Sequence, residues 1–310
     1  MKRYIIIAAV SVLIANGACK FDDPDDAYPY TSVLFPNQDY NRNLIVGEGL
    51  KLRVGISFTG LMSNDRDRTV QYIIDPSLIV AADRSELPPA YYTCGHASQI
   101  TVPAGQMKGY LPVQLDSAAF LSDPKALTGE YILPVRLVSS SDVDSITEGL
   151  DFMRISISYY AKQHGNYTYE GSITRTQGSL SEDTTYHNIA SEDNGIRFLE
   201  TTGPTNFRMI ADPTNSADPA KSDNFSLLLE APVHGGGAVT VAADPLSAVV
   251  VTPDGESTYD AAGKTFRLRY RYTLANGTEC RVSETLVFRN RIRDVQENGI
   301  YINEWRGISE

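Results

Sequence analysis

The chain of 310 residues is long enough for two domains of ordinary size, and its 42% hydrophobic and 21% charged residues are typical of a globular protein. Its formal net charge of −11 at pH 7 should repel polyanions, which argues against nucleic acid as a partner. Beyond the N-terminal region, no apolar run reaches the roughly 20 residues that a membrane-spanning helix needs.

The N-terminal residues have the features of a secretory signal. A basic start and an apolar run, residues 2–15, lead through small residues to Cys19. A cysteine at this position is the pattern of a bacterial lipoprotein signal, so we expect residues 1–18 to be removed and Cys19 to carry the lipid. The alternative is an ordinary cleavage site beside an unmodified cysteine. Residues 19–27 are acidic and contain a proline, which indicates a tether with nothing to bury.

From residue 28 the chain alternates apolar and polar residues, as strands with one buried face do. The clearest case is the segment 51–58, in which Leu52, Val54 and Ile56 fall on one side. Only residues 117–127 suggest a helix, which Pro124 interrupts. Further strands are expected at 31–35, 70–74, 99–102, 108–115, 130–138 and 151–159. About seven short strands predict an immunoglobulin-like β-sandwich over residues 28–160.

The alternation lapses over residues 160–165, so we place a domain boundary there and interpret His164 as a linker residue. The clearest strands of the second half, 265–274 and 279–289, are joined by a turn with the sequence Ala-Asn-Gly-Thr, a strong hairpin signal. Other strands are expected at 166–171, 196–202, 206–211, 225–230, 239–243 and 248–252. Sequential antiparallel strands predict a closed up-and-down barrel over residues 165–310, with a second sandwich as the alternative.

Two cysteines remain after Cys19. An exported protein could join Cys94 to Cys280 by a disulfide, but both residues also fit strands as small buried apolar groups. Neither has a histidine or second cysteine at metal-binding spacing, and the aspartate-rich turns lack the spacing of a calcium loop. We therefore expect no metal site.

Two parts of the chain resemble known modules. Residues 87–92, 100–105 and 109–113, which include Leu-Pro-Pro-Ala-Tyr-Tyr and Ile-Thr-Val-Pro-Ala-Gly, resemble an N-terminal domain of unknown function common in Bacteroidetes cell-surface lipoproteins. Residues 286–294, followed by Asn-Glu-Trp at 303–305, resemble the closing motif of a partner module that is expected to be lipocalin-like. The chain departs from that pattern because residues 295–302 are inserted between the two parts of the motif. The acidic segment after Cys19 resembles the surface-export signal of such lipoproteins.

The resemblance implies a function. Proteins of this kind are typically encoded beside an outer-membrane transporter and a substrate-capture lipoprotein of the SusC/SusD type. The implied protein is a glycan-binding accessory lipoprotein, anchored in the outer membrane and exposed at the cell surface. Its partners would be a polysaccharide or oligosaccharide and SusC/SusD-type proteins, and it would touch the membrane only through its lipid.

An enzyme would need a recognisable set of catalytic residues. The chain has no HExxH, no GxSxG and no phosphate-binding glycine loop, and the resemblance carries no catalytic residues. Glycosidase chemistry needs only two carboxylates, which composition leaves open, but the second half is too short for a catalytic barrel of roughly 250 residues. We therefore predict a non-enzyme without a cofactor.

Glycan binding instead needs flat aromatic faces with polar groups around them. Most of the 18 tyrosines lie in alternating strands and are explained as core residues. Tyr186 with His187, and Tyr259, stand in polar segments interpreted as loops, so they are the candidate glycan contacts. Two other functions remain open. The protein could be a structural or adhesive surface component, or its barrel could carry a small apolar ligand.

Overall fold

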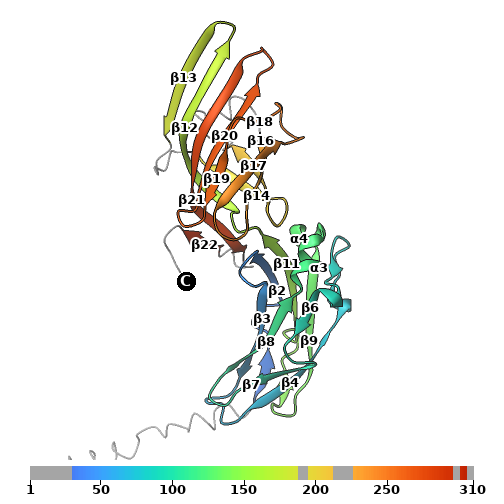
Figure 1. Cartoon of the computed structure of the whole chain (residues 1–310). Helices are drawn as coiled ribbons and strands as arrows, with labels where there is room; N and C mark the ends of the chain where they lie inside the picture. The colour runs from blue at the N-terminus through green and yellow to red at the C-terminus, as the bar shows by residue number, and fades with distance from the viewer. Residues whose placement is uncertain (1–29, 188–194, 212–225, 296–300, 306–310) are drawn as a thin grey trace, which may run out of the picture.

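The computed structural model describes residues 30–187, 195–211, 226–295 and 301–305. The predicted signal, the predicted lipid attachment at Cys19 and the predicted tether lie outside the described residues, as does the side chain of Trp305. The described chain is all-β, as predicted, and forms two bodies stacked end to end (Figure 1). In the described part no helix is long and apolar enough to cross a membrane.

The N-terminal body consists of two sheets that face each other. The first sheet has the order β10 (Ser145–Ile146), β1 (Ser32–Leu34), β3 (Lys51–Thr59), β8 (Lys108–Leu115) and β6 (Tyr92–Cys94). The second has the order β2 (Asp39–Ile45), β11 (Phe152–Tyr160), β9 (Tyr131–Ser139), β4 (Arg68–Ile74) and β7 (Gln99–Val102), with β5 (Ser85–Glu86) beside β9. The strands predicted at 51–58, 108–115, 130–138 and 151–159 are thus confirmed.

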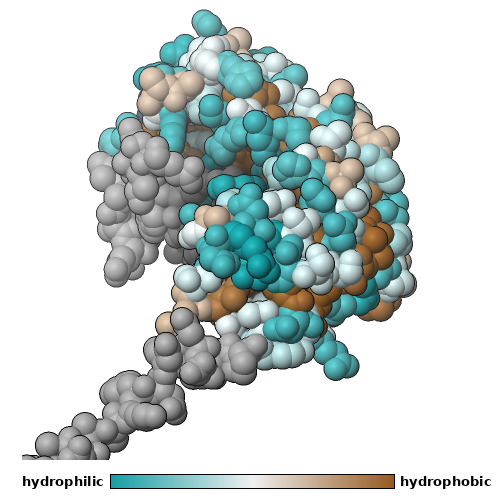
Figure 2. All heavy atoms as spheres, turned by 90° about the horizontal axis from the view of Figure 1, so that it is seen from below, coloured by the Kyte–Doolittle hydropathy of each residue, from teal (hydrophilic) through white to brown (hydrophobic). Residues whose placement is uncertain are grey.

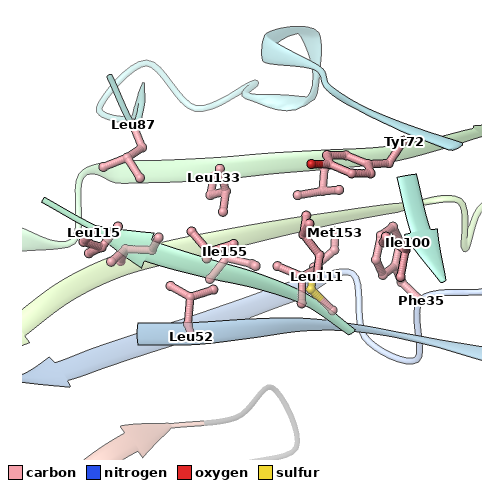
Figure 3. Packing of buried hydrophobic residues seen from close by; sticks show 14 of the residues in the cluster. Phe35, Leu52, Tyr72, Leu87, Ile100, Leu111, Leu115, Leu133, Met153 and Ile155 are labelled. Atoms are coloured by element: carbon pink, nitrogen blue, oxygen red, sulfur yellow. The ribbon is translucent and has the colours of Figure 1, made fainter. Parts of the chain in front are cut away.

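Alternation explains why these two sheets pack. Along β3 and β8 every second side chain is buried, so each strand contributes one apolar row to a shared core. Figure 3 shows part of that core, in which Leu52 and Leu111 from the first sheet meet Leu133 and Ile155 from the second. The predicted interrupted helix is confirmed as α3 (Ser117–Ser122) and α4 (Lys125–Thr128), separated at Pro124. Two short 3-10 turns, η1 (Pro76–Leu78) and η2 (Pro89–Tyr91), complete this body.

The C-terminal body is a single antiparallel sheet that closes on itself. Its strands follow the chain, and β12 and β21 pair from Asn166 opposite Asn290 to Thr176 opposite Glu279, which completes the circle. The circle runs through β12 (Gly165–Gln177), β14 (Arg197–Thr201), β15 (Asn206–Ala211), β16 (Ser226–Glu230), β17 (Gly237–Ala243), β19 (Ser257–Asp260), β20 (Thr265–Thr273) and β21 (Glu279–Val295). We call it the closed sheet.

Three further strands lie outside that circle. β13 (Leu180–His187) and β22 (Tyr301–Trp305) extend it beside β12 and β21, and β18 (Thr252–Pro253) pairs with β20. Residues 248–252, predicted as a strand, contribute only Thr252 to β18. The prediction failed there because residues 249–251 are apolar, as in a strand, but do not pair with any described strand. Inside the closed sheet, aromatic rings such as Phe207, Phe266 and Tyr270 are almost completely buried.

Cys94 lies in β6 and Cys280 in β21, and neither forms a disulfide with another described residue. Cys280 is completely buried among the core residues of the closed sheet, whereas Cys94 is half-buried at the edge of the sandwich. They serve as small apolar groups, which is the second of the two interpretations of the sequence.

The connection between the two bodies is short and hydrogen-bonded to both. Gln163 donates from Nε2 to the carbonyl oxygen of Pro232 at 2.7 Å, and Arg291 donates from Nη1 to the carbonyl of Lys162 at 2.9 Å. On the sandwich side, Val46 N–H donates to the carbonyl of Tyr160 at 2.9 Å. The connection is therefore part of the packed structure.

His164 lies in that connection and is buried. Its ring stacks on Tyr160 with centroids 3.8 Å apart, and its Nδ1 accepts the backbone N–H of Thr201 at 3.2 Å. Burial, with a smaller contribution from the positive charge of Arg291, lowers the pKa of His164 to about 3. The imidazole is therefore neutral and serves as a packing group.

Candidate functional site

The aromatic residues predicted to contact glycan do not form one exposed surface. Residues 181–188 were interpreted as a loop, but the described part of that segment belongs to strand β13. Tyr186 is half-buried there, with its ring 5.8 Å from that of Tyr169 and its hydroxyl 3.2 Å from a carboxylate oxygen of Glu284. His187 is exposed at the end of the strand, 3.5 Å from the carboxylate of Glu170.

Tyr259 is not in a loop either. It belongs to β19, is only 7% exposed and packs on the ring of Phe266 at 4.5 Å. The loop prediction was wrong because the strand is four residues long and mostly polar, so only Ser257 and Tyr259 alternate inward. A glycan contact by Tyr186, His187 or Tyr259 stays a prediction.

The interior of the closed sheet contains a buried ion pair. Arg197 Nη2 lies 3.2 Å from Glu284 Oε2, and the two side chains are 1% and 0% exposed. Tyr270 donates its hydroxyl to the other oxygen of Glu284 at 2.9 Å, and the guanidinium of Arg197 lies 3.8 Å from the ring centroid of Tyr169. This cluster is sealed from solvent, so it is a structural feature and offers no access to a substrate.

The sandwich has an open side where a groove forms. β1 pairs only with residues 57–59 of β3, because the chain then crosses to the other sheet and becomes its edge strand β2. Residues 51–56 of β3 therefore have no neighbour on that side among the strands that the structure describes. The gap between β2 and β3 holds a cavity of about 240 Å³, whose floor includes the core residues Leu52, Met153 and Ile155. We call it the β2–β3 groove.

Two tyrosines line this groove. Tyr40 comes from β2, and Tyr110 comes from the outer face of β8, where its side chain is 47% exposed. Tyr110 is paired with Gly55 of β3, and a Cβ atom at Gly55 would lie 3.3 Å from the Tyr110 ring. The glycine therefore lets the ring lie across β3 towards β2.

Cationic side chains surround the two rings. Arg42, Arg53 and Lys108 line the groove, and the guanidinium carbons of Arg42 and Arg53 lie 5.6 and 5.2 Å from the ring centroids of Tyr40 and Tyr110. A second hollow of about 510 Å³ adjoins the groove, shares Arg42 and Arg53 with it, and adds Lys51. No carboxylate lines either hollow. The site can therefore offer aromatic faces and hydrogen-bond donors together.

Three other hollows of the described structure also combine tyrosines with cations, but each includes a carboxylate in its lining, from Asp39, Glu279 or Glu48. Among the described residues, no group of three or more His, Cys, Asp or Glu is placed to hold a metal ion. Seen from below, the end of the sandwich mixes hydrophilic and hydrophobic side chains, and the hydrophobic ones gather towards one side (Figure 2). The β2–β3 groove is thus the strongest candidate in the described part of the chain.

This groove was not predicted from the sequence, although one signal was present. On β8 the polar face reads Lys108, Tyr110, Pro112 and Gln114, so a tyrosine stands where solvent-facing residues are expected. The other wall was not predictable in this way, because β2 is polar and gains its place by parallel pairing with β11, more than 100 residues later. That pairing leaves no local pattern.

Comparisons with known proteins agree with the fold. A family model described as a "-like, N-terminal domain" matches residues 28–144. A solved protein of unknown function from Bacteroides ovatus resembles the chain with a TM-score of 0.67 and 20% identity, covering 89% of this chain and 98% of its own. No curated protein matches. The fold described above therefore also occurs in a Bacteroides protein.

Two weaker likenesses have TM-scores below 0.5. One is to an auxiliary nutrient binding protein from Bacteroides thetaiotaomicron, with a TM-score of 0.43 and 13% identity over 83% of this chain and 92% of that one. The other is to a multidomain protein from Bacteroides ovatus that includes a domain of unknown function, with a TM-score of 0.44 and 12% identity over 89% of this chain and all of that one.

Proposed function

We propose that this protein is a non-catalytic glycan-binding protein and that the β2–β3 groove is its binding site. The observation that carries the proposal is the pair of tyrosines, Tyr40 and Tyr110, framed by side chains that donate hydrogen bonds. Aromatic faces pack against the C–H patches of sugar rings, and cationic or amide donors hold the hydroxyl groups. Asn37 and Arg53 supply such donors beside the rings.

The test is affinity electrophoresis of the whole mature chain through gels that contain a panel of polysaccharides. Tyr110→Ala should abolish the retardation seen with the wild type, because the exposed ring is removed while the core stays intact. Tyr30→Ala is the matched control, since Tyr30 is 62% exposed and lies outside the groove. Tyr186→Ala and His187→Ala test the site predicted from the sequence. Unchanged retardation of Tyr110→Ala would assign binding to another surface.

The location belongs to the same proposal. Residues 1–18 would be a signal, Cys19 the lipidated residue and residues 19–27 a tether that holds the protein at the outer surface of the outer membrane. Mass spectrometry of the native N-terminus tests this, with acyl groups on Cys19 as the expected result. Cys19→Ser should release the protein from the membrane fraction, and continued membrane association of that variant would contradict the anchor.

The two bodies would be an immunoglobulin-like module, residues 28–160, and a lipocalin-like module, residues 165–310. Two facing sheets support the first assignment, and sequential antiparallel strands that close through β12 and β21 support the second. The buried aromatic side chains inside the closed sheet argue against a carrier of small apolar ligands. Separate expression of each module, followed by circular dichroism, tests whether each folds alone.

A docking role towards SusC/SusD-type proteins is the second candidate function. The observation that favours it is β13, which among the described strands pairs only with β12 and so presents a strand edge without a described neighbour. Such an edge can accept a strand from a partner. Co-purification of a SusC/SusD-type pair with the wild type, and its loss when residues 179–187 are replaced by a short turn, would support this role. Retention of the pair by that variant would contradict it.

A further inference from the structure

We propose that the ligand of the β2–β3 groove is an anionic polysaccharide, whose carboxylate or sulfate groups pair with Lys51, Arg53 and Lys108 while a sugar ring packs on Tyr110. This inference rests on the proposed function, because it names the class of glycan that the groove selects. Its starting point is the concentration of positive charge around the groove in a chain whose formal net charge is −11.

Three cations of the groove differ from several other arginines of the described structure, which are paired with carboxylates. Elsewhere in the described structure Arg136 pairs with Asp75 and Asp151, and Arg208 pairs with Glu200 and Asp244. Lys51, Arg53 and Lys108, in contrast, form no ion pair with another described residue, and all three are exposed. Their charge is therefore available to neutralise an anionic ligand.

Arg154 shows that the difference is local. It lies on β11 beside β2 and forms an ion pair with Asp39, on the side of β2 where a separate hollow contains both residues. A carboxylate thus neutralises the arginine on one side of β2, whereas no carboxylate lines the β2–β3 groove on the other. The lining of the hollow beside Arg154 therefore carries less net positive charge than the lining of the groove.

The cations are spaced along two paired strands. Lys51 and Arg53 face outwards on β3, and Lys108 lies on β8 opposite Ser57, with Tyr110 and Gly55 between the two ends. From Lys51 to Ser57 the strand advances about 20 Å at roughly 3.4 Å per residue. A row of that length suits a polymer with repeated charges better than a single small anion.

The net charge of the whole chain does not oppose this inference. At physiological ionic strength the Debye length is about 8 Å, so acidic residues elsewhere on the surface are largely screened at the groove. The local field is set by the nearest charges, which are the groove cations themselves. The expectation that polyanions are repelled therefore fails at this one site.

Isothermal titration calorimetry of the whole mature chain tests the inference with four probes. These are polygalacturonate, dextran sulfate, the neutral glucan dextran and a single-stranded oligonucleotide. We expect binding to polygalacturonate or dextran sulfate that weakens as salt is raised, and the probe that binds identifies carboxylate or sulfate as the ligand group. Binding of dextran alone would overturn the inference but leave the proposed function standing. Failure to bind either anionic probe would overturn the inference, whereas the proposed function fails only if no polysaccharide of the electrophoresis panel retards the protein.

The variant Arg53→Gln with Lys108→Gln removes two groove cations and keeps Tyr110. Its affinity for the anionic probe should fall about tenfold, and the dependence on salt should flatten. The matched control, Arg267→Gln with Arg269→Gln, removes two exposed cations of β20 outside the groove and so causes the same change in net charge. An equal loss of affinity in the control would overturn the assignment of the site. Equal affinity for the oligonucleotide would overturn its assignment to glycan.

Discussion

Replacing Glu284 with glutamine tests the buried ion pair inside the closed sheet. The substitution keeps the size of the side chain and removes its charge. The guanidinium of Arg197, which is 1% exposed, would then remain in the interior without its carboxylate 3.2 Å away. Burying an uncompensated charge is unfavourable, since neither solvent nor a counter-charge stabilises it.

The structure sets the expected magnitude. Glu284 accepts from Arg197 and from the hydroxyl of Tyr270 at 2.9 Å, and its side chain is 0% exposed. Removing one partner of such a pair costs about 3–5 kcal/mol in the free energy of unfolding. The pair Arg281–Glu279 is the contrast, because its atoms are 2.6 Å apart but its side chains are 52% and 40% exposed. Glu279→Gln should cost about 1 kcal/mol or less.

Urea denaturation at pH 7, followed by circular dichroism, measures both effects. For an m-value of about 2–3 kcal/mol per molar urea, the midpoint of Glu284→Gln should fall by roughly 1–2 M. The double variant Arg197→Met with Glu284→Leu removes both charges and should recover most of that loss. The reasoning is refuted if Glu284→Gln loses no more stability than Glu279→Gln.

Three further predictions concern packing. Burial is the main cause that lowers the pKa of His164 from 6.5 to about 3. Between these two values the unfolded chain binds one more proton than the folded chain. The free energy of unfolding therefore decreases as the pH is lowered, by up to about 1.4 kcal/mol per pH unit. His164→Gln should lack this part of the slope in urea denaturation between pH 5 and 6.5, and equal slopes would contradict the burial. Gly171→Ala places a Cβ 2.4 Å from the carbonyl oxygen of Ser283 and should cost about 1–3 kcal/mol, measured as a lower urea midpoint; an unchanged midpoint would show that the strands have room. Gly55→Val should displace the Tyr110 ring and weaken polysaccharide binding severalfold with little loss of stability, because valine favours strands; full affinity would argue against a role for that ring.

Strands with one buried face were predictable because their alternation is local. The segments 51–58 and 108–115 became β3 and β8 with nearly the predicted bounds. The strand β2 escaped prediction because Asp39–Ile45 is polar along most of its length and is placed by pairing with the distant β11. One wall of the groove is β2, so the sequence could not predict that the two walls lie side by side.

The candidate residues failed for a related reason. Tyr186 and Tyr259 stand in polar surroundings, which indicated loops, but Tyr186 lies in β13 beside the closed sheet and Tyr259 lies in β19, a strand of the closed sheet. Glu284 carried a signal that was overlooked, since it occupies the same phase of β21 as Cys280, Val282 and Leu286, all of which point inwards. A carboxylate in phase with a buried apolar row predicts an internal partner. The identity of that partner, Arg197, depends on the fold.

The hydrogen bonds of the connection around Gln163 hold the two bodies in one relative orientation. Gln163 and Arg291 form hydrogen bonds that hold the connecting residues on the side of the closed sheet, and Val46 does so on the sandwich side. A partner that binds the closed sheet would therefore place the groove at a set height and angle. A polysaccharide bound in the groove would then be held in one direction relative to that partner. Such a connection would fix the orientation of the groove within an assembly.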